Sequence, residues 1–141
     1  MIATSDLRIG NWLYESECTR YPMYVHTIGE DYVYLNFEGN EGDVWECKPE
    51  DLQGIKLTKG ILEKVGFSYD NGYWRLRTNE DTYLEYYPHE YRLRKWYTGV
   101  DEWNNHARVR EITFEYQCHY LHEFQNAFYM ATKQELEVKP W

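Results

Sequence analysis

Cysteine and histidine lie close together at one place in this sequence, the run Cys118-His119-x-x-His122. Residues four apart share one face of a helix, so Cys118 and His122 would both reach a single metal ion there. A structural zinc site needs four protein ligands, however, and no second Cys or His pair has a suitable spacing. We therefore expect no metal and no other cofactor, with His119 at a helix entry and His122 in solvent.

Motifs of catalysis are missing. Carboxylates adjoin one another, as in Glu80/Asp81, but adjacency provides neither the cleft nor the shifted pKa that general acid–base catalysis needs. Serine is scarce, there is no nucleophile elbow, and no glycine spacing matches a phosphate-binding loop. The sequence therefore predicts a protein that is not an enzyme.

A basic and aromatic cluster stands out in an otherwise acidic chain. Guanidinium and indole groups are planar and bury much area with few rotatable bonds, which suits protein interfaces and base stacking. The candidate binding residues are Arg92, Arg94, Trp96, Tyr97, Trp103, Arg108 and Arg110. The alternative, which the sequence favours, is a solvated sheet face on which Arg75, Arg77, Arg92 and Arg94 pair with Glu85 and Glu90.

Trp103 lies in the middle of the longest polar connection in the second half of the chain, Thr98 to His106. Loops on a rigid sheet commonly carry recognition. Acidic and amide residues surround this tryptophan, so it is either an exposed anchor or a plug folded back on the core, and the sequence leaves both open.

The chain's 141 residues suit one domain, with two lobes at 1–56 and 57–141 as an alternative organisation. A net charge of −9, from 15 basic and 24 acidic residues, opposes binding to nucleic acid. No stretch has the length of a membrane span and the start does not resemble a signal peptide, so we expect a cytoplasmic protein. Three widely spaced cysteines, Cys18, Cys47 and Cys118, indicate reduced thiols, although a Cys18–Cys47 bridge stays open.

Short alternating runs predict strands in both halves of the chain. In the first half they are Leu7–Tyr14, Met23–Ile28, Tyr32–Phe37 and Asp43–Cys47, with a polar loop ending at Pro22, and they favour an SH3-like partial barrel. In the second half, further runs predict strands at 82–87, 91–94 and 109–116. Asn71-Gly72 predicts a two-residue hairpin turn that pairs Tyr69 with Trp74. Charged and apolar residues share one face of the last strand, which predicts either a bulge or a strand that runs past the core.

Two helices complete the expected fold. The sequence predicts both ends of the shorter helix, because Thr58 can cap its start and Gly66-Phe67 suits a Schellman motif at its end. The longer, Tyr120 to Thr132, carries an apolar stripe that would cover the second sheet: Leu121, Phe124, Ala127, Phe128 and Ala131. Its other side is polar, with His122, Glu123, Gln125 and Asn126. The predicted class is α+β, with an SH3-like strand cluster, a connector helix and a C-terminal helix on a second antiparallel sheet.

Three stretches in this order and spacing resemble small uncharacterised proteins encoded by phages and mobile elements of Bacteroidetes. They are Asp6-Leu-Arg-Ile-Gly-Asn-Trp12, Leu57-Thr-Lys-Gly-Ile-Leu-Glu-Lys-Val-Gly-Phe67, and Tyr120-Leu-His-Glu-Phe-Gln-Asn-Ala-Phe-Tyr-Met-Ala-Thr132 with Glu135-Leu-Glu-Val138. A glycine usually follows the long helix in that family, and Lys133 stands in its place here. The resemblance implies a bacterial or phage origin and an intracellular setting, and it brings no functional residues.

The leading functional hypothesis is a non-enzymatic module that binds another protein, with a host factor as the partner that the phage resemblance implies. Self-association is also open, because 18% of the residues are aromatic. The alternative hypothesis is a small-nucleotide binder of the sponge type, in which aromatic rings stack the base and arginines hold phosphate.

Overall fold

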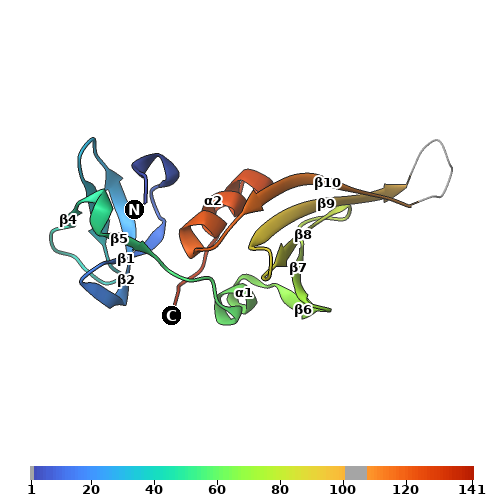
Figure 1. Cartoon of the computed structure of the whole chain (residues 1–141), viewed down its shortest axis with the longest axis horizontal. Helices are drawn as coiled ribbons and strands as arrows, with labels where there is room; N and C mark the ends of the chain where they lie inside the picture. The colour runs from blue at the N-terminus through green and yellow to red at the C-terminus, as the bar shows by residue number, and fades with distance from the viewer. Residues whose placement is uncertain (1, 101–107) are drawn as a thin grey trace. The chain divides into compact units, whose positions relative to one another are not determined.

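The computed structural model describes residues 2–100 and 108–141 and confirms the α+β class. Two antiparallel five-stranded sheets and two α-helices make up the described fold (Figure 1). The chain divides into two compact units. The first unit comprises Met1–Leu57, His119–Asn126 and Lys139–Trp141, and the second comprises Thr58–Cys118 and Ala127–Val138.

The sheet of the first unit has the SH3-like arrangement that the sequence predicts. Its strands lie in the order β4-β3-β2-β1-β5, so the last strand returns to pair with the first. A single 3-10 turn, Pro49–Asp51, leads into that last strand. The strands are β1 (Trp12–Glu15), β2 (Cys18–Ile28), β3 (Val33–Asn36), β4 (Trp45–Cys47) and β5 (Leu52–Gly54).

Two features of this sheet differ from the sequence prediction. The strand β5 was not predicted, because three residues carry no readable periodicity and one of them is glycine. The predicted polar loop ending at Pro22 is instead the first part of β2, which begins at Cys18 opposite Glu15. The core of this unit is mainly aliphatic. Its central residues, Leu13, Val25, Val33 and Leu35, have no exposed surface.

Gly54 in β5 permits a close approach by the chain that precedes the C-terminal helix. A Cβ atom at Gly54 would lie 2.5 Å from Cγ of Tyr120, so no other residue fits without a shift of the ring. Lys56 and Tyr120 form an isolated antiparallel bridge, and the Leu121 amide donates to the Ile55 carbonyl at 2.8 Å. The helix start is thereby fixed to the first unit.

The second unit begins with helix α1 (Lys59–Val65), whose ends match the sequence prediction. The Thr58 hydroxyl accepts a hydrogen bond from the Ile61 amide at 3.2 Å. Gly66 has a φ of 111°, and the Phe67 amide donates to the Leu62 carbonyl at 3.0 Å, as in a Schellman motif.

The second sheet runs β10-β9-β8-β7-β6 without a crossover. Its strands are β6 (Ser68–Asp70), β7 (Tyr73–Arg77), β8 (Thr82–Tyr87), β9 (Arg92–Val100) and β10 (Arg108–Gln117). The predicted hairpin is confirmed: Asn71 and Gly72 both have positive φ, and Tyr69 pairs with Trp74. The predicted bulge is present in β10 between Ile112 and Phe114.

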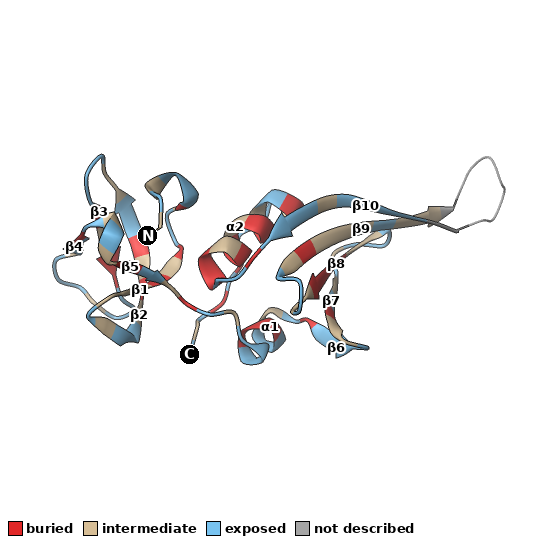
Figure 2. Ribbon diagram, viewed as in Figure 1, coloured by how far each residue is buried: buried red, intermediate tan, exposed pale blue. Residues whose placement is uncertain are grey.

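β9 is longer than predicted. Residues 98–100 continue the strand and pair with β10 only, so the polar connection is shorter than the predicted Thr98 to His106. Trp74, Leu84, Tyr86 and Leu93 are buried and form the core face of the second sheet (Figure 2).

Helix α2 (Leu121–Thr132) buries all five residues of its predicted apolar stripe. Its residues up to Asn126 belong to the first unit, and those from Ala127 onward to the second. The second part packs on the second sheet, where Nζ of Lys95 donates to the Ala131 carbonyl at 2.7 Å. Lys133, which follows the helix, has a φ of 61°, which is the left-handed conformation that glycine favours after a helix.

The opposite side of α2 is polar, as the sequence predicts, and its amide side chains bond to the first unit. Gln125 is buried; its carbonyl accepts from the Trp12 amide at 2.9 Å and its amide donates to the Gly10 carbonyl at 3.1 Å. Asn126 accepts from the Asn11 side chain at 2.9 Å and donates to the Asp6 carbonyl at 2.8 Å. These polar residues attach the helix to the start of the chain.

Candidate functional site

Most of the candidate residues from the sequence lie on one face of the second sheet, opposite Leu84 and Tyr86. We call this surface the arginine-aromatic face. Strands β7 to β10 supply its residues, which are Tyr73, Arg75, Tyr83, Glu85, Tyr87, Arg92, Arg94, Trp96, Arg110 and Glu115. Because alternate residues of a strand point the same way, the pairing of these strands brings the side chains together.

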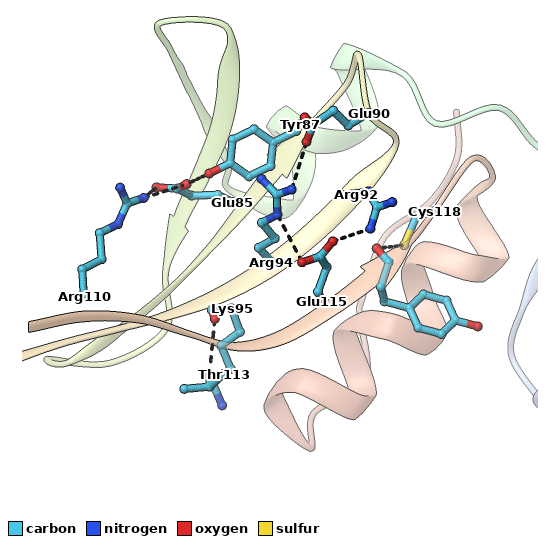
Figure 3. Close-up of polar contacts among 11 residues, drawn as sticks. Glu85, Tyr87, Glu90, Arg92, Arg94, Lys95, Arg110, Thr113, Glu115 and Cys118 are labelled. Atoms are coloured by element: carbon cyan, nitrogen blue, oxygen red, sulfur yellow. Dashed lines mark hydrogen bonds and ion pairs between the residues drawn. The ribbon is translucent and has the colours of Figure 1, made fainter.

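Glu85 is the centre of this face and has no exposed surface. Nη2 of Arg75 donates to its carboxylate at 2.9 Å, and Nη2 of Arg110 donates to both carboxylate oxygens at 2.9 and 3.1 Å. The Tyr87 hydroxyl also donates to it (Figure 3). A buried carboxylate with these partners is satisfied by the protein itself.

The arginines also lie over aromatic rings. The guanidinium of Arg110 is 3.8 Å from the centre of the Trp96 ring, and Arg94 is 4.6 Å from the centre of the Tyr87 ring. Such cation–π contacts restrict the side chains of both partners. The rings that stack on a ligand's base in the nucleotide hypothesis are thus already covered by arginine.

Two further carboxylates, Glu90 and Glu115, form ion pairs with Arg92 and Arg94. Arg94 contacts Glu90 at 3.1 Å and Glu115 at 3.5 Å, and Arg92 contacts Glu115 as well (Figure 3). Desolvation lowers the pKa of Arg94, but its hydrogen bond to Tyr87 and the two carboxylates outweigh this and leave the pKa raised. The positive charge of this face is therefore largely neutralised in place.

The pKa values of two further groups report the same environment. Desolvation is the largest single effect on Arg75 and lowers its pKa, but the hydrogen bond to Glu85 and the charges of Tyr73, Glu85 and Tyr83 together outweigh it and leave the pKa raised. Burial, followed by the hydrogen bond to Glu85, raises the pKa of the Tyr87 hydroxyl. Tyr87 therefore stays protonated and remains a donor at neutral pH.

The structure brings together four of the seven candidate residues, Arg92, Arg94, Trp96 and Arg110. Tyr97 points to the sheet face opposite the arginine-aromatic face, where its side chain lies against Gly99. Arg108 is in β10, but its side chain and the whole of Trp103 lie outside the described residues. The alternative prediction paired arginines of the sheet with Glu85 and Glu90, and the pairs Arg75–Glu85 and Arg94–Glu90 are present. Arg77 does not follow that prediction, because it donates to the Glu80 carbonyl at 3.3 Å.

A different surface, which the sequence analysis missed, is an open groove of about 650 Å³ in the first unit. We call it the aromatic groove. Four aromatic side chains line it: Tyr21, Phe37, Trp45 and Trp141. Tyr21 is 68% exposed, Trp45 53% and Trp141 55%, although large apolar side chains are normally buried.

Two of the exposed rings of the groove, Trp45 and Trp141, pack against neighbouring rings. Trp45 packs against Phe37 with ring centres 5.9 Å apart, and Trp141 meets Trp12 edge-on at 5.4 Å. Met23 and Pro22 contribute further apolar surface. A groove with pre-positioned rings loses little side-chain entropy when a ligand binds.

The charged residues that line the groove are few. Glu15, Glu38 and Arg20 are at its edge, and Glu38 pairs with Lys139. In the sequence, Tyr21 precedes Pro22 at the end of the predicted polar loop, and Trp45 lies in the predicted strand Asp43–Cys47. Sequence patterns do not report exposure, and both residues were assigned to ordinary strand or loop positions.

None of the three cysteines forms a disulfide bond, as expected from their spacing, and of the three Cys18 lines the groove. Burial, with smaller contributions from Glu15 and Asp51, raises the pKa of Cys47 to about 11. Cys118 is completely buried. Of these thiols, Cys18 is the one that solvent reaches.

The residues of the suspected metal motif do not share a helix face. Cys118 precedes the start of α2 at Leu121, so its spacing to His122 is not helical. His122 is buried, not solvated, and its Nδ1 atom has no hydrogen-bond partner among the described residues. Burial lowers the pKa of His122 against the opposing effects of Glu123 and Asp6. Within residues 2–100 and 108–141, no three His, Cys, Asp or Glu side chains are grouped to hold a metal ion.

Comparison of the chain with protein-family models, curated proteins and solved structures gave no match. In the part of the chain that the structure describes, neither helix is long and apolar enough to cross a membrane.

Proposed function

We propose that this chain is a non-enzymatic protein-binding module and that the aromatic groove is its contact surface. One observation carries the proposal: Tyr21, Trp45 and Trp141 are each more than half exposed around a common apolar groove. Tryptophan and tyrosine are the residues that most often dominate binding energy at protein interfaces. The resemblance to phage proteins makes a bacterial host protein the partner class that we propose.

A small nucleotide is the weaker candidate ligand. The arginine-aromatic face has the residue types that such a ligand needs, and Arg110 and Trp96 already form a stacked pair at 3.8 Å. A phosphate group would, however, have to displace carboxylates such as Glu85 from the arginines that they hold. That exchange replaces one set of charge-assisted hydrogen bonds with another and leaves little net gain.

The test is capture of partners from a Bacteroidetes lysate by the wild-type protein and by Trp45→Ala. Removing an interface tryptophan should weaken partner binding by about 2 kcal/mol or more, because little else replaces its buried area. The melting temperature should stay close to that of the wild type, since Trp45 is half exposed. Mass spectrometry of the captured proteins and a thermal melt give the two measurements.

The matched control is Tyr69→Ala, which removes another exposed aromatic side chain, one that lies outside the groove. This variant should capture the same proteins as the wild type. If Trp45→Ala retains every specific partner, or if no specific partner is captured in repeated experiments, the proposal fails.

A further inference from the structure

We infer that the aromatic groove binds a proline-rich segment in the polyproline II conformation, with arginine or lysine beside the prolines. The inference rests on the proposed function and adds the chemistry of the partner. It follows from three properties of the groove: its rings, the backbone of β2 along it, and the charge of the first unit.

The rings favour a ligand that needs side-chain contacts and no internal hydrogen bonds. A polyproline II segment meets this description, because its backbone is solvated and its proline rings are rigid before binding. Grooves lined by aromatic residues recognise such segments by packing rings against prolines. Three exposed aromatic side chains line one groove here: Tyr21, Trp45 and Trp141.

The backbone argues against the main competing mode, in which an extended peptide adds a strand to the sheet. β3 pairs with β2 only from Tyr24 onward, so the part of β2 before Tyr24 has no neighbour on that side in the described ladder. Pro22 lies in this part and lines the groove. Proline has no N–H to donate, so it interrupts the hydrogen bonding that an added strand requires.

The charge of the first unit favours a basic partner. This unit holds 12 of the chain's 24 acidic residues but only five of its 15 basic ones, a net charge of −7. At the groove itself Glu38 is paired with Lys139 and Arg20 is nearby, so Glu15 is the carboxylate best placed to meet a basic residue of the ligand. Charged groups at a rim of this kind set partner choice and association rate more than affinity.

The experiment is calorimetric titration of the wild-type chain, Trp45→Ala and Glu15→Gln with synthetic peptides. The first peptide carries a run of prolines behind a pair of arginines. Two matched peptides replace either the prolines with alanine or the arginines with glutamate. The proline-arginine peptide should bind the wild type and bind Trp45→Ala at least about tenfold more weakly.

The matched peptides test the two parts of the inference. Equal binding of the alanine peptide would overturn the polyproline II conformation, and equal binding of the glutamate peptide would overturn the preference for positive charge. Glu15→Gln should weaken binding of the arginine peptide a few-fold and leave the glutamate peptide unchanged or bound better. A response of both peptides in the same direction would also count against the inference.

Selection from a random peptide library on the wild type and on Trp45→Ala separates this inference from the proposed function. Peptides that need Trp45 but lack proline would leave the proposed function standing and overturn the inference. A library that yields no peptide dependent on Trp45, together with an empty lysate capture, would overturn both. Light scattering tests a second copy as the occupant: a dimer of the wild type that Trp45→Ala dissociates would overturn the inference in favour of self-association.

Discussion

The two surfaces contain similar residue types but differ in how far their groups are already bonded within the protein. On the arginine-aromatic face, Glu85 is completely buried and Arg110 bonds to it while lying over Trp96. In the aromatic groove, Trp45 packs against Phe37 and is 53% exposed. A surface whose groups are bonded to one another stabilises the fold, whereas aromatic rings that remain more than half exposed around a groove are available to a ligand.

The same contrast holds for the buried ionisable groups of the two units. Glu85 in the second unit has Arg75, Arg110 and the Tyr87 hydroxyl as partners. His122 in the first unit is also buried, but its Nδ1 atom has no partner in the described chain. A buried polar group stabilises a fold only when its hydrogen bonds are satisfied, so the two groups should respond differently to substitution and to pH.

Removing the carboxylate of Glu85 should give the largest effect. We expect Glu85→Ala to lower the free energy of unfolding by about 2 to 3 kcal/mol, because Arg75 and Arg110 lose their common partner. The value lies below that for a fully buried pair because these arginine side chains are 42% and 49% exposed and can regain water. Urea denaturation measures it.

Glu115→Ala is the control for this prediction, since Glu115 also pairs with two arginines but is partly exposed. Surface ion pairs contribute little, so the loss should be under about 1 kcal/mol. Equal losses for the two variants would mean that the burial of Glu85 does not matter, and the comparison between the two surfaces would lose its basis.

Replacing one tryptophan on each surface with alanine compares how much each surface contributes to stability. We expect Trp96→Ala to cost about 2 kcal/mol of stability, because it removes half-buried apolar area and the stacking partner of Arg110. Trp45→Ala should cost under about 1 kcal/mol, since its ring is 53% exposed. Thermal melts of the two variants side by side give the difference, and a larger loss for Trp45 would reverse the assignment of the surfaces.

Local signals in the sequence were sufficient for much of the fold. The ends of α1 depend on Thr58 and Gly66, and the second hairpin depends on Asn71-Gly72, so the residues that fix each structure are adjacent to it. The apolar stripe of α2 was readable for the same reason. The bulge of β10 was one of two outcomes that its mixed face predicted.

Features set by distant parts of the chain were not predictable. Gln125 is buried because Gly10 and Trp12, more than 100 positions away in the sequence, satisfy its amide. The aromatic groove likewise joins Tyr21, Trp45 and Trp141, which no spacing relates to one another. For the candidate site, the sequence anticipated that Glu85 and Glu90 pair with arginines of the sheet face. It did not anticipate Glu115 as a partner of Arg92 and Arg94, because Glu115 comes from a strand more than 20 positions later in the chain.

The buried histidine predicts how stability depends on pH. Burial lowers the pKa of His122 in the folded protein, so the unfolded chain takes up a proton at the ordinary histidine pKa, about 6.5, before the folded protein does. Since proton uptake favours the state that binds more protons, stability should fall as the pH decreases below about 6.5, by at most about 1.4 kcal/mol per pH unit from this group. At higher pH the group is neutral in both states and contributes no pH dependence.

His122→Gln should remove this part of the pH dependence of stability. Urea denaturation at several values between pH 5 and 8 should therefore show a difference in the free energy of unfolding between the two proteins that changes below about pH 6.5 and is constant above it. His89→Gln, at an exposed position, is the control and should keep the wild-type slope. A difference between wild type and His122→Gln that is constant over the whole range would show that the unpartnered Nδ1 atom is not desolvated in the folded protein. The contrast with Glu85 would then be limited to substitution and would not extend to protonation.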